Sequence, residues 1–392
     1  EVEDYFVICE IRKREEHKMI VMDIRLDNFM AFKNFHMNMS YPKKIVNSYI
    51  EEEFLKDHPN FRYKKVNIIM GANASGKTSL GRMLMNIFNF MDKKEMEKIT
   101  GVICDTHKKA TFSMDFVTYD GDFLYRIITQ IAPKTEEKYK ETDVSICVNN
   151  VKIGVKDSYE SCSKRLDEQN CNMKKNFVEE LGKIKGLSWL FEYPVDFGGV
   201  YRYDTYYNSQ KYLTVLENTL KALDTSIIKV EKLRDVKNSF VIRMKNQDVI
   251  IQDGELTKAD TLSSGTKAGI AVAGMLTAII NGENGFYYCD EKFSYIHTDI
   301  EKAFLTLMIQ CLKGNDQLFF TTHNTDILDL PLPKHTFTFF KKDTNDDMET
   351  IKCINVSDFL KRSTDSVKNA AENDLFSVAP SMELIYELEK LK

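Results

Sequence analysis

The sequence lacks any apolar segment long enough to cross a membrane. No run of about 18 or more uncharged apolar residues occurs along the chain. The N-terminal residues Glu1–Tyr5 also lack the basic-then-apolar order of a secretory signal. We therefore expect a soluble, cytoplasmic protein without a membrane partner.

Cysteine pairs with metal-ligand or redox spacing are also missing. The eight cysteines are scattered, without any Cys-x-x-Cys pair or suitably spaced histidines, so we expect reduced thiols and no zinc site. The 54 basic and 59 acidic residues give a net charge of −5, which provides no global attraction for nucleic acid, although a local basic face is compatible with it. No sustained heptad repeat is present, which argues against a long coiled-coil arm.

The sequence does contain a phosphate-binding loop between an apolar strand and an apolar helix. Ile68–Met70 reads as the strand, and the pattern Gly71-x-x-x-x-Gly76-Lys77-Thr78 follows it. The glycines let backbone N–H groups converge on phosphates, Lys77 reaches the β- and γ-phosphates, and the Thr78 hydroxyl suits Mg²⁺. The alternative is an ordinary glycine turn, but the flanking strand and helix favour a nucleotide site. The residues expected to hold the nucleotide here are Gly71, Asn73, Ala74, Ser75, Gly76, Lys77, Thr78 and Ser79.

Three more polar stretches stand beside apolar elements further along the chain. Ser263–Gly265 precedes an apolar helix, a place where serine is common as a cap. The apolar strand Phe286–Glu291 ends in two carboxylates, of which Asp290 can hold Mg²⁺ and Glu291 can polarise an attacking water. The strand Leu318–His323 ends in a histidine. A lone histidine there is usually a packed or surface residue, but its place after the other motifs favours a function.

In this order and spacing, the four motifs resemble those of the ATP-binding-cassette (ABC) nucleotide fold, over roughly residues 22–360. In that family two ATPase heads close face to face, and the Ser-Ser-Gly of one head contacts the γ-phosphate on the P-loop of the other. The resemblance implies that Ser263, Ser264 and Gly265 bind nucleotide in trans. The stretch Ser294–His297 takes the place of the family's D-loop.

The resemblance also implies the chemistry of the site. It makes Glu291 the catalytic base, His323 the sensor of the γ-phosphate and Lys77 the third catalytic residue. ATP and Mg²⁺ are the implied cofactors, with Thr78 and Asp290 as metal ligands. The implied partner is a second copy of the chain, in an ATP-sandwich homodimer or a higher homo-oligomer.

The long interval between the P-loop and Ser263 is typical of the SMC-like branch. The opening Leu26–Phe35, the signature Leu262–Lys267, the stretch Thr321–Leu328 and the hairpin His335–Phe359 look like compact bacterial AAA-family ATPases of that branch. These include the ATPase part of overcoming-lysogenisation-defect nucleases and the ATPases of anti-phage and abortive-infection systems. The chain departs from them in having no Toprim-like domain after residue 360 and no assignable Gln lid.

This resemblance implies an ATPase whose ATP-dependent dimerisation controls a partner effector, a nuclease or a toxin, in anti-phage defence. The alternative is an SMC-like DNA-repair or DNA-maintenance ATPase that clamps nucleic acid directly, which would make DNA a partner. A transporter ATPase subunit is disfavoured by the long insertion.

The predicted fold class is α/β: a P-loop NTPase with an ABC/SMC-like head, an antiparallel β subdomain, a mainly parallel core sheet and an inserted helical subdomain. The predicted units are an N-terminal appendage (1–21), lobe I with Walker A and the β subdomain (22–155), an inserted helical and aromatic subdomain (156–238), lobe II with signature, Walker B and His switch (239–360) and a C-terminal helical docking element (361–392).

Local patterns give finer expectations. Alternating residues predict β-hairpins at 24–39 and 110–130, and a further β pair near Val144–Val155. Apolar spacing predicts a short helix within Tyr41–Lys65 and a helix over Leu213–Leu233. The aromatic stretch Trp189–Tyr212 favours core packing over base stacking on single-stranded nucleic acid. The acidic residues Asp343–Asp347 favour a hairpin loop over a metal site.

Overall fold

The computed structural model of the chain describes residues 19–45, 48–118, 122–192, 209–253, 255–257, 261–343, 350–362, 364–376 and 386–391. Most of the predicted N-terminal appendage, most of the aromatic stretch and residues 344–347 of the acidic stretch lie outside the described residues. Within the described ranges, no helix is long and apolar enough to span a membrane.

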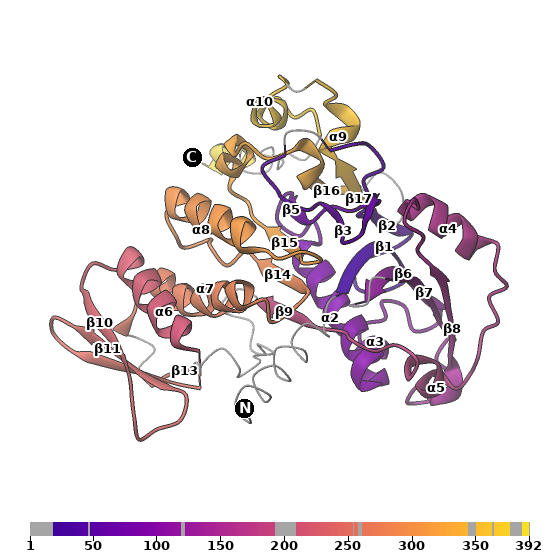
Figure 1. Cartoon of the computed structure of the whole chain (residues 1–392), viewed down its shortest axis with the longest axis horizontal. Coiled ribbons are helices and arrows are strands. Elements are labelled where there is room, and N and C mark those ends of the chain that lie inside the picture. Colours follow the sequence, from indigo (N-terminus) through magenta and orange to yellow (C-terminus); the bar gives the residue numbers. More distant parts are fainter. Residues whose placement is uncertain are drawn as a thin grey trace.

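A six-stranded sheet forms the centre of the molecule, in the order β17-β16-β5-β15-β14-β9 (Figure 1). Its strands are parallel except for the antiparallel pair β16–β17, which confirms the predicted mainly parallel core sheet. The bounds are β5 Val66–Met70, β9 Trp189–Glu192, β14 Phe286–Asp290, β15 Gln317–Thr321, β16 Phe337–Asp343 and β17 Thr350–Asn355.

Both faces of the central sheet are buried, because successive residues of each strand enter opposite cores. Along β14, Phe286 and Tyr288 pack with α2 (Lys77–Lys93), whereas Tyr287 and Cys289 pack with α7 (Ser264–Asn281) and α8 (Thr298–Cys311). A strand with two buried faces reads as a continuous apolar run. This explains why β5, β14 and β15 are visible in the sequence.

An antiparallel five-stranded sheet, β2-β1-β6-β7-β8, shares the α2 core with the central sheet. Its bounds are β1 Met19–Asp27, β2 Phe35–Asn38, β6 Ala110–Thr118, β7 Phe123–Ile131 and β8 Val144–Lys152. The two predicted hairpins are confirmed by the β1–β2 and β6–β7 pairs. The β pair predicted near Val144–Val155 is wrong, because β8 is one strand that pairs with β7.

The helix predicted within Tyr41–Lys65 is also wrong. This segment forms the short strands β3 (Phe54–Leu55) and β4 (His58–Arg62). Leu55, Phe61 and Tyr63 are buried in a cluster on the antiparallel sheet together with α4 (Tyr159–Asp167). The segment thus contributes Leu55, Phe61 and Tyr63 to a buried cluster.

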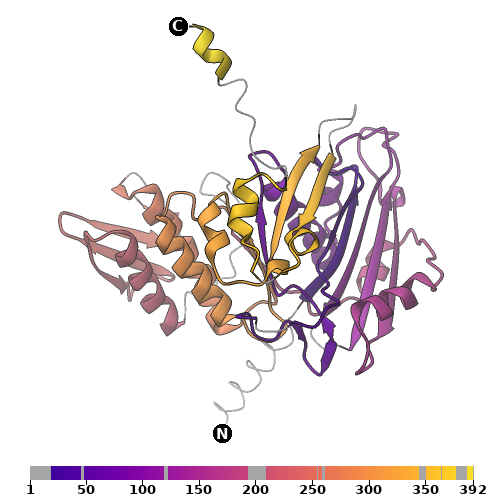
Figure 2. The ribbon, with the colours of Figure 1, turned by 90° about the horizontal axis from the view of Figure 1, so that it is seen from above.

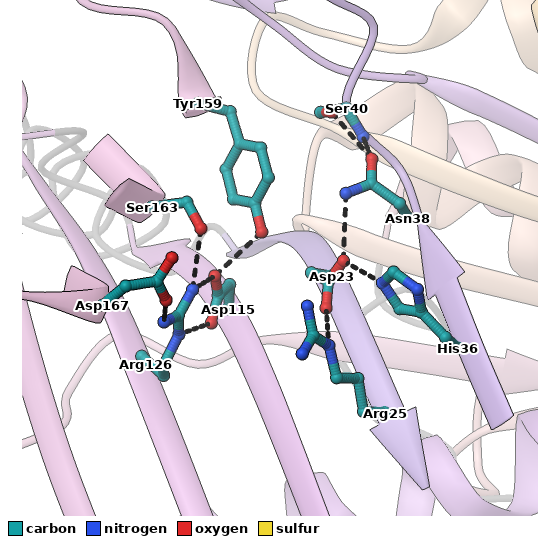
Figure 3. A network of polar contacts seen from close by, with 10 residues as sticks. All are labelled: Asp23, Arg25, His36, Asn38, Ser40, Asp115, Arg126, Tyr159, Ser163 and Asp167. Carbon is teal, nitrogen blue, oxygen red and sulfur yellow. Dashed lines mark hydrogen bonds and ion pairs between the residues drawn. The ribbon is translucent and has the colours of Figure 1, made fainter. Parts of the chain in front are cut away.

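An ion pair with a buried carboxylate connects α4 to the five-stranded sheet (Figure 3). The Asp115 carboxylate on β6 receives two hydrogen bonds from Arg126 on β7, both at 2.7 Å, and one from the Tyr159 hydroxyl at 2.8 Å. Arg126 also donates to Ser163 and Asp167 of α4. Burial raises the pKa of Asp115, and the hydrogen bonds from Arg126 oppose that shift.

A third sheet of four antiparallel strands, β10 to β13, packs on α6 and α7. It lies at one end of the long axis of the molecule, and the five-stranded sheet lies at the other end (Figures 1 and 2). Its bounds are β10 Ile227–Lys232, β11 Ser239–Met244, β12 Asp248–Gln252 and β13 Glu255–Leu256, with α6 at Gln210–Leu223. The predicted helix over Leu213–Leu233 is therefore too long. The range 156–238 contains helices together with β9 and β10, which belong to different sheets.

The remaining elements are short. They are α3 Met96–Thr100, α5 Phe177–Leu181, α9 Val356–Phe359 and α10 Val367–Glu372, with 3-10 turns η1 Glu141–Asp143, η4 Thr325–Asp329, η5 Lys334–Thr336 and η6 Leu388–Leu391. The predicted hairpin at His335–Phe359 is confirmed by the β16–β17 pair.

Candidate functional site

The loop between β5 and α2 has a backbone that glycine alone fits at two positions. Gly71 has φ 147° and Gly76 has φ 99°, in the region that side chains rarely adopt. A Cβ at Gly71 would lie 2.4 Å from the Phe340 carbonyl oxygen, and one at Gly76 would lie 2.4 Å from Ile351 Cδ1. The glycines of the pattern are thus required by geometry and close packing.

Lys77 is buried inside the loop that precedes it. Its side chain is 3% exposed, and Nζ donates to the carbonyls of Gly71 at 2.9 Å and Ala72 at 3.1 Å. Nζ also lies 3.3 Å from Glu291 Oε1. Burial lowers the pKa of the Lys77 ammonium, and the Glu291 carboxylate opposes that shift.

Thr78 and Asp290, the two predicted metal ligands, lie in direct contact. The Thr78 hydroxyl donates to Asp290 Oδ2 at 2.6 Å, and the Thr321 hydroxyl donates to Oδ1 at 2.6 Å. Burial raises the pKa of Asp290, and these two hydrogen bonds oppose the shift. A hydroxyl and a carboxylate are oxygen ligands of the kind that Mg²⁺ prefers. The described residues contain no group of three or more His, Cys, Asp or Glu that could hold a metal.

Glu291 faces Lys77 and His323. Its φ of 45° is unusual for a non-glycine residue and is held by hydrogen bonds from its N–H to the carbonyl and the hydroxyl of Thr321. His323 Nε2 lies 2.8 Å from Glu291 Oε1. Burial would raise the pKa of Glu291, but the hydrogen bond from His323 and the charge of Lys77 outweigh burial and lower it. The carboxyl is therefore ionised near neutral pH.

The start of α2 offers unused hydrogen-bonding groups beside these side chains. Gly76, the N-cap of α2, offers no side-chain acceptor to the first-turn N–H groups, which a helix start leaves without intrahelical partners. Ser75 Oγ is buried without a hydrogen-bond partner among the described residues. Asn73 and Ala74 are exposed, and Ser79 lies in the first turn of α2. A phosphate group would satisfy such an arrangement.

The signature residues lie apart from this cluster. Ser263 caps α7 by accepting a hydrogen bond from the Thr266 N–H at 3.1 Å, and Ser263 and Ser264 are exposed. A Cβ at Gly265 would lie 2.8 Å from the Tyr295 carbonyl oxygen, so Ser294–His297 packs on the start of α7. In the part of the chain that the structure describes, no hydrogen bond or ion pair joins Ser263–Gly265 to the P-loop, Asp290, Glu291 or His323.

Sequence reasoning missed two residues that support the site. Thr321 holds both Asp290 and the backbone of Glu291. The Tyr288 hydroxyl donates to the Lys77 carbonyl at 2.7 Å, beneath Gly81 of α2. Gly81, inside the predicted helix, was the signal in the sequence for this close contact, because a glycine within a helix often marks close packing.

Two cavities lie near the central sheet. One of about 300 Å³ is lined by Met30, Ala31, Lys33, Cys104, Lys342, Thr350 and Ile351, and it adjoins the P-loop because Ile351 packs on Gly76. The other, a groove of about 740 Å³, shares no lining residue with the P-loop. Its lining is rich in basic side chains, which are Lys43, Lys44, Lys334, Lys361 and Arg362.

No protein-family model and no curated protein sequence matches this chain. Among solved structures, the chain is similar to the Smc head bound to the C-winged helix domain of ScpA, with 14% identity, a TM-score of 0.51 and coverage of 87% of this chain and 99% of that one. It is also similar to the Smc head domain with a coiled coil and joint from Pyrococcus yayanosii, with 9% identity, a TM-score of 0.50 and coverage of 90% and 100%. The chain thus has an SMC head-like α/β fold.

Proposed function

We propose that this chain, which has the fold of an SMC head, binds Mg·ATP and hydrolyses it. The observation that carries this proposal is one hydrogen-bonded cluster built from three segments: Lys77 and Thr78, Asp290 and Glu291, and His323. These segments meet where β5, β14 and β15 end, which is where open α/β sheets bind their ligands.

Each residue of the cluster has a task in this proposal. Mg²⁺, held by Thr78 and Asp290, neutralises phosphate charge when bound. Lys77 provides a buried cation for the phosphates. Glu291, kept ionised, accepts the proton of the attacking water, and His323 orients Glu291 through the 2.8 Å contact.

The cavity beside Gly76 supports a nucleoside as the rest of the ligand. Met30 and Ile351 offer apolar side chains to a base, and Lys33 and Lys342 offer donors to the ribose or phosphates. We propose that ATP lies with its base in this cavity and its phosphates on the P-loop.

The finer proposal concerns what the hydrolysis does. Among the described residues, no hydrogen bond or ion pair joins Ser264 and Gly265 at the start of α7 to their own P-loop, which supports their action on ATP held by a second copy. Dimerisation on ATP then controls an effector, a nuclease or a toxin, in anti-phage defence. The defence role is supported by sequence resemblance alone. ATP-dependent activation of a nuclease or toxin encoded beside this chain would test it.

Direct clamping of DNA is the second candidate. The basic lining of the 740 Å³ groove is the observation that favours it. DNA binding that weakens steeply with salt and is lost in Lys361→Glu would support this function. DNA binding that survives the reversal of charge would remove the groove from consideration.

Isothermal calorimetry with Mg·ATP tests the nucleotide site. Lys77→Ala removes the buried cation, and we expect at least a tenfold loss of affinity, roughly the value of one charge-assisted contact. Lys93→Ala, an exposed lysine in the last turn of the same helix, is the matched control and should bind like the wild type. Equal affinity of wild type and Lys77→Ala would overturn the proposal.

A further inference from the structure

Glu301 on α8 is a buried carboxylate that touches none of the proposed catalytic groups. Its exposed fraction is 3%. Oε1 accepts a hydrogen bond from the Thr322 hydroxyl at 2.7 Å, and Oε2 accepts one from Asn324 Nδ2 at 2.7 Å. These two partners are the residues on either side of His323. Burying a carboxylate costs free energy unless hydrogen-bond donors satisfy it. The position of Glu301 therefore depends on Thr322 and Asn324.

The same contacts fix the backbone that carries His323. The Asn324 N–H donates to the Thr322 hydroxyl at 3.0 Å, and the Thr322 N–H donates to the Ile69 carbonyl at 3.2 Å. Asn324 Nδ2 also reaches Thr298 Oγ1 at 3.2 Å, in the first turn of α8. The loop is thus tied to α8 before and after the histidine.

We infer that Glu301 is a positioning residue for hydrolysis: through Thr322 and Asn324 it fixes His323 in contact with Glu291. This inference rests on the proposed function. Without the carboxylate, Thr322 and Asn324 lose their shared acceptor, and the histidine between them is free to leave Glu291. Burial raises the pKa of Glu301, and the hydrogen bonds from Asn324 and Thr322 oppose that shift.

Glu301 also connects the loop that carries His323 to the stretch Ser294–His297, through α8. Helix α8 begins directly after Ser294–His297, and Tyr295 in that stretch packs on Gly265 at the start of α7. The start of α7, the stretch Ser294–His297, α8 and the loop of His323 therefore form one continuous series of contacts.

A double-mutant cycle tests the inference. We expect kcat for ATP hydrolysis to fall by about tenfold or more in Glu301→Ala, because misplaced catalytic groups cost at least that much. In a His323→Ala background, Glu301→Ala should cause no further loss, since Glu301 acts through the histidine. Independent losses that multiply in the double variant would overturn the inference.

Glu180→Ala is the matched control for the loss of a buried carboxylate. Glu180 has the same exposed fraction of 3% and accepts hydrogen bonds from Lys174 and Lys183. The Glu180→Ala substitution should lower Tm without changing kcat, both in the wild type and in the His323→Ala variant. Thr322→Val removes one of the two hydrogen bonds and replaces Glu301→Ala if that variant does not fold. Glu301→Gln, which still accepts from Asn324, should restore part of kcat.

A second measurement needs no hydrolysis. In a crystal structure of Glu301→Ala, the distance from His323 Nε2 to Glu291 Oε1 should exceed the wild-type 2.8 Å. An unchanged distance would overturn the inference even if ATP is hydrolysed. A wild type that neither binds nor hydrolyses ATP, with a displaced His323 in Glu301→Ala, would instead overturn the proposed function.

Discussion

At the scale of single residues, the surroundings shift the pKa values of two adjacent carboxyls in opposite directions. Asp290 is fully buried, and burial raises its pKa despite two hydroxyl donors. Glu291 turns towards His323 and Lys77, which outweigh burial and lower its pKa. Carboxyls whose environments separate their pKa values can take different tasks. The sequence predicted both residues, but the left-handed backbone that turns Glu291 to its partners is a feature of the fold alone.

Glu291→Gln should retain Mg·ATP binding and lose hydrolysis. The amide keeps the shape of the side chain but cannot accept the proton of the attacking water, and general bases contribute about 10²–10⁴-fold to rates. Phosphate release measures the hydrolysis, and calorimetry on the same sample measures the binding. Hydrolysis at the wild-type rate would show that another residue is the base.

The lowered pKa of Glu291 also predicts how stability depends on pH. A carboxyl whose pKa is lower in the folded state stabilises the fold above its unfolded value, near 4.5. This contribution is lost as pH falls through the folded-state pKa. The free energy of unfolding of the wild type, relative to Glu291→Gln, should therefore decrease between pH 7 and pH 3. Urea unfolding of both proteins measures it, and a pH-independent difference would refute the assignment.

At the scale of elements, the sequence predicted β5, β14, β15, the β16–β17 hairpin and the start of α7, because apolar runs stand next to polar motifs there, but it did not predict β9 as a strand. It failed where short apolar spacings fit a helix and a strand equally. The helix predicted over Leu213–Leu233 ends at Leu223 because Asp224 accepts hydrogen bonds from the N–H and hydroxyl of Ser226, which forms a turn before β10. That Asp-Thr-Ser turn was the signal available in the sequence.

Gly81→Ala tests the packing of α2 on the central sheet. A Cβ at Gly81 would lie 2.6 Å from the Tyr288 ring, so we expect a loss of about 1–3 kcal/mol from overpacking. Without the clash, alanine would stabilise the helix by about 1 kcal/mol relative to glycine. The two cases predict changes of opposite sign in Tm, which thermal unfolding measures. An increase in Tm would contradict the close contact between α2 and β14.

At the scale of the whole molecule, the order of motifs along the chain indicated a nucleotide site, but the sequence could not show how completely one chain assembles it. The P-loop, the two carboxylates and His323 meet in one cluster, because the carboxyl ends of neighbouring parallel strands share one edge. Ser263 and Ser264 of the signature stand at the start of a different helix and are exposed. The separation of these residues from the cluster depends on how α7 packs in the fold, and no local sequence pattern encodes this packing.

Ser264→Arg therefore should leave ATP binding to the isolated chain nearly intact and block ATP-driven association and turnover. The exposed N–H groups at the start of α7 stabilise phosphate charge only when another copy supplies the ATP, and an arginine side chain obstructs that contact. Light scattering with and without ATP measures association. Thr306→Arg, at an exposed position of α8, adds the same charge elsewhere and should behave like the wild type.

Mixing two inactive variants distinguishes action in trans from action within one chain. Ser264→Arg has an intact P-loop and Lys77→Ala has an intact signature, so a heterodimer of the two holds one complete composite site and one site with both defects. Turnover should therefore reappear on mixing, with at most one working site per heterodimer. Action within one chain predicts no recovery, because neither chain then holds both intact motifs. Specific activity that stays constant down to concentrations where light scattering detects only monomers would likewise refute the two-copy site.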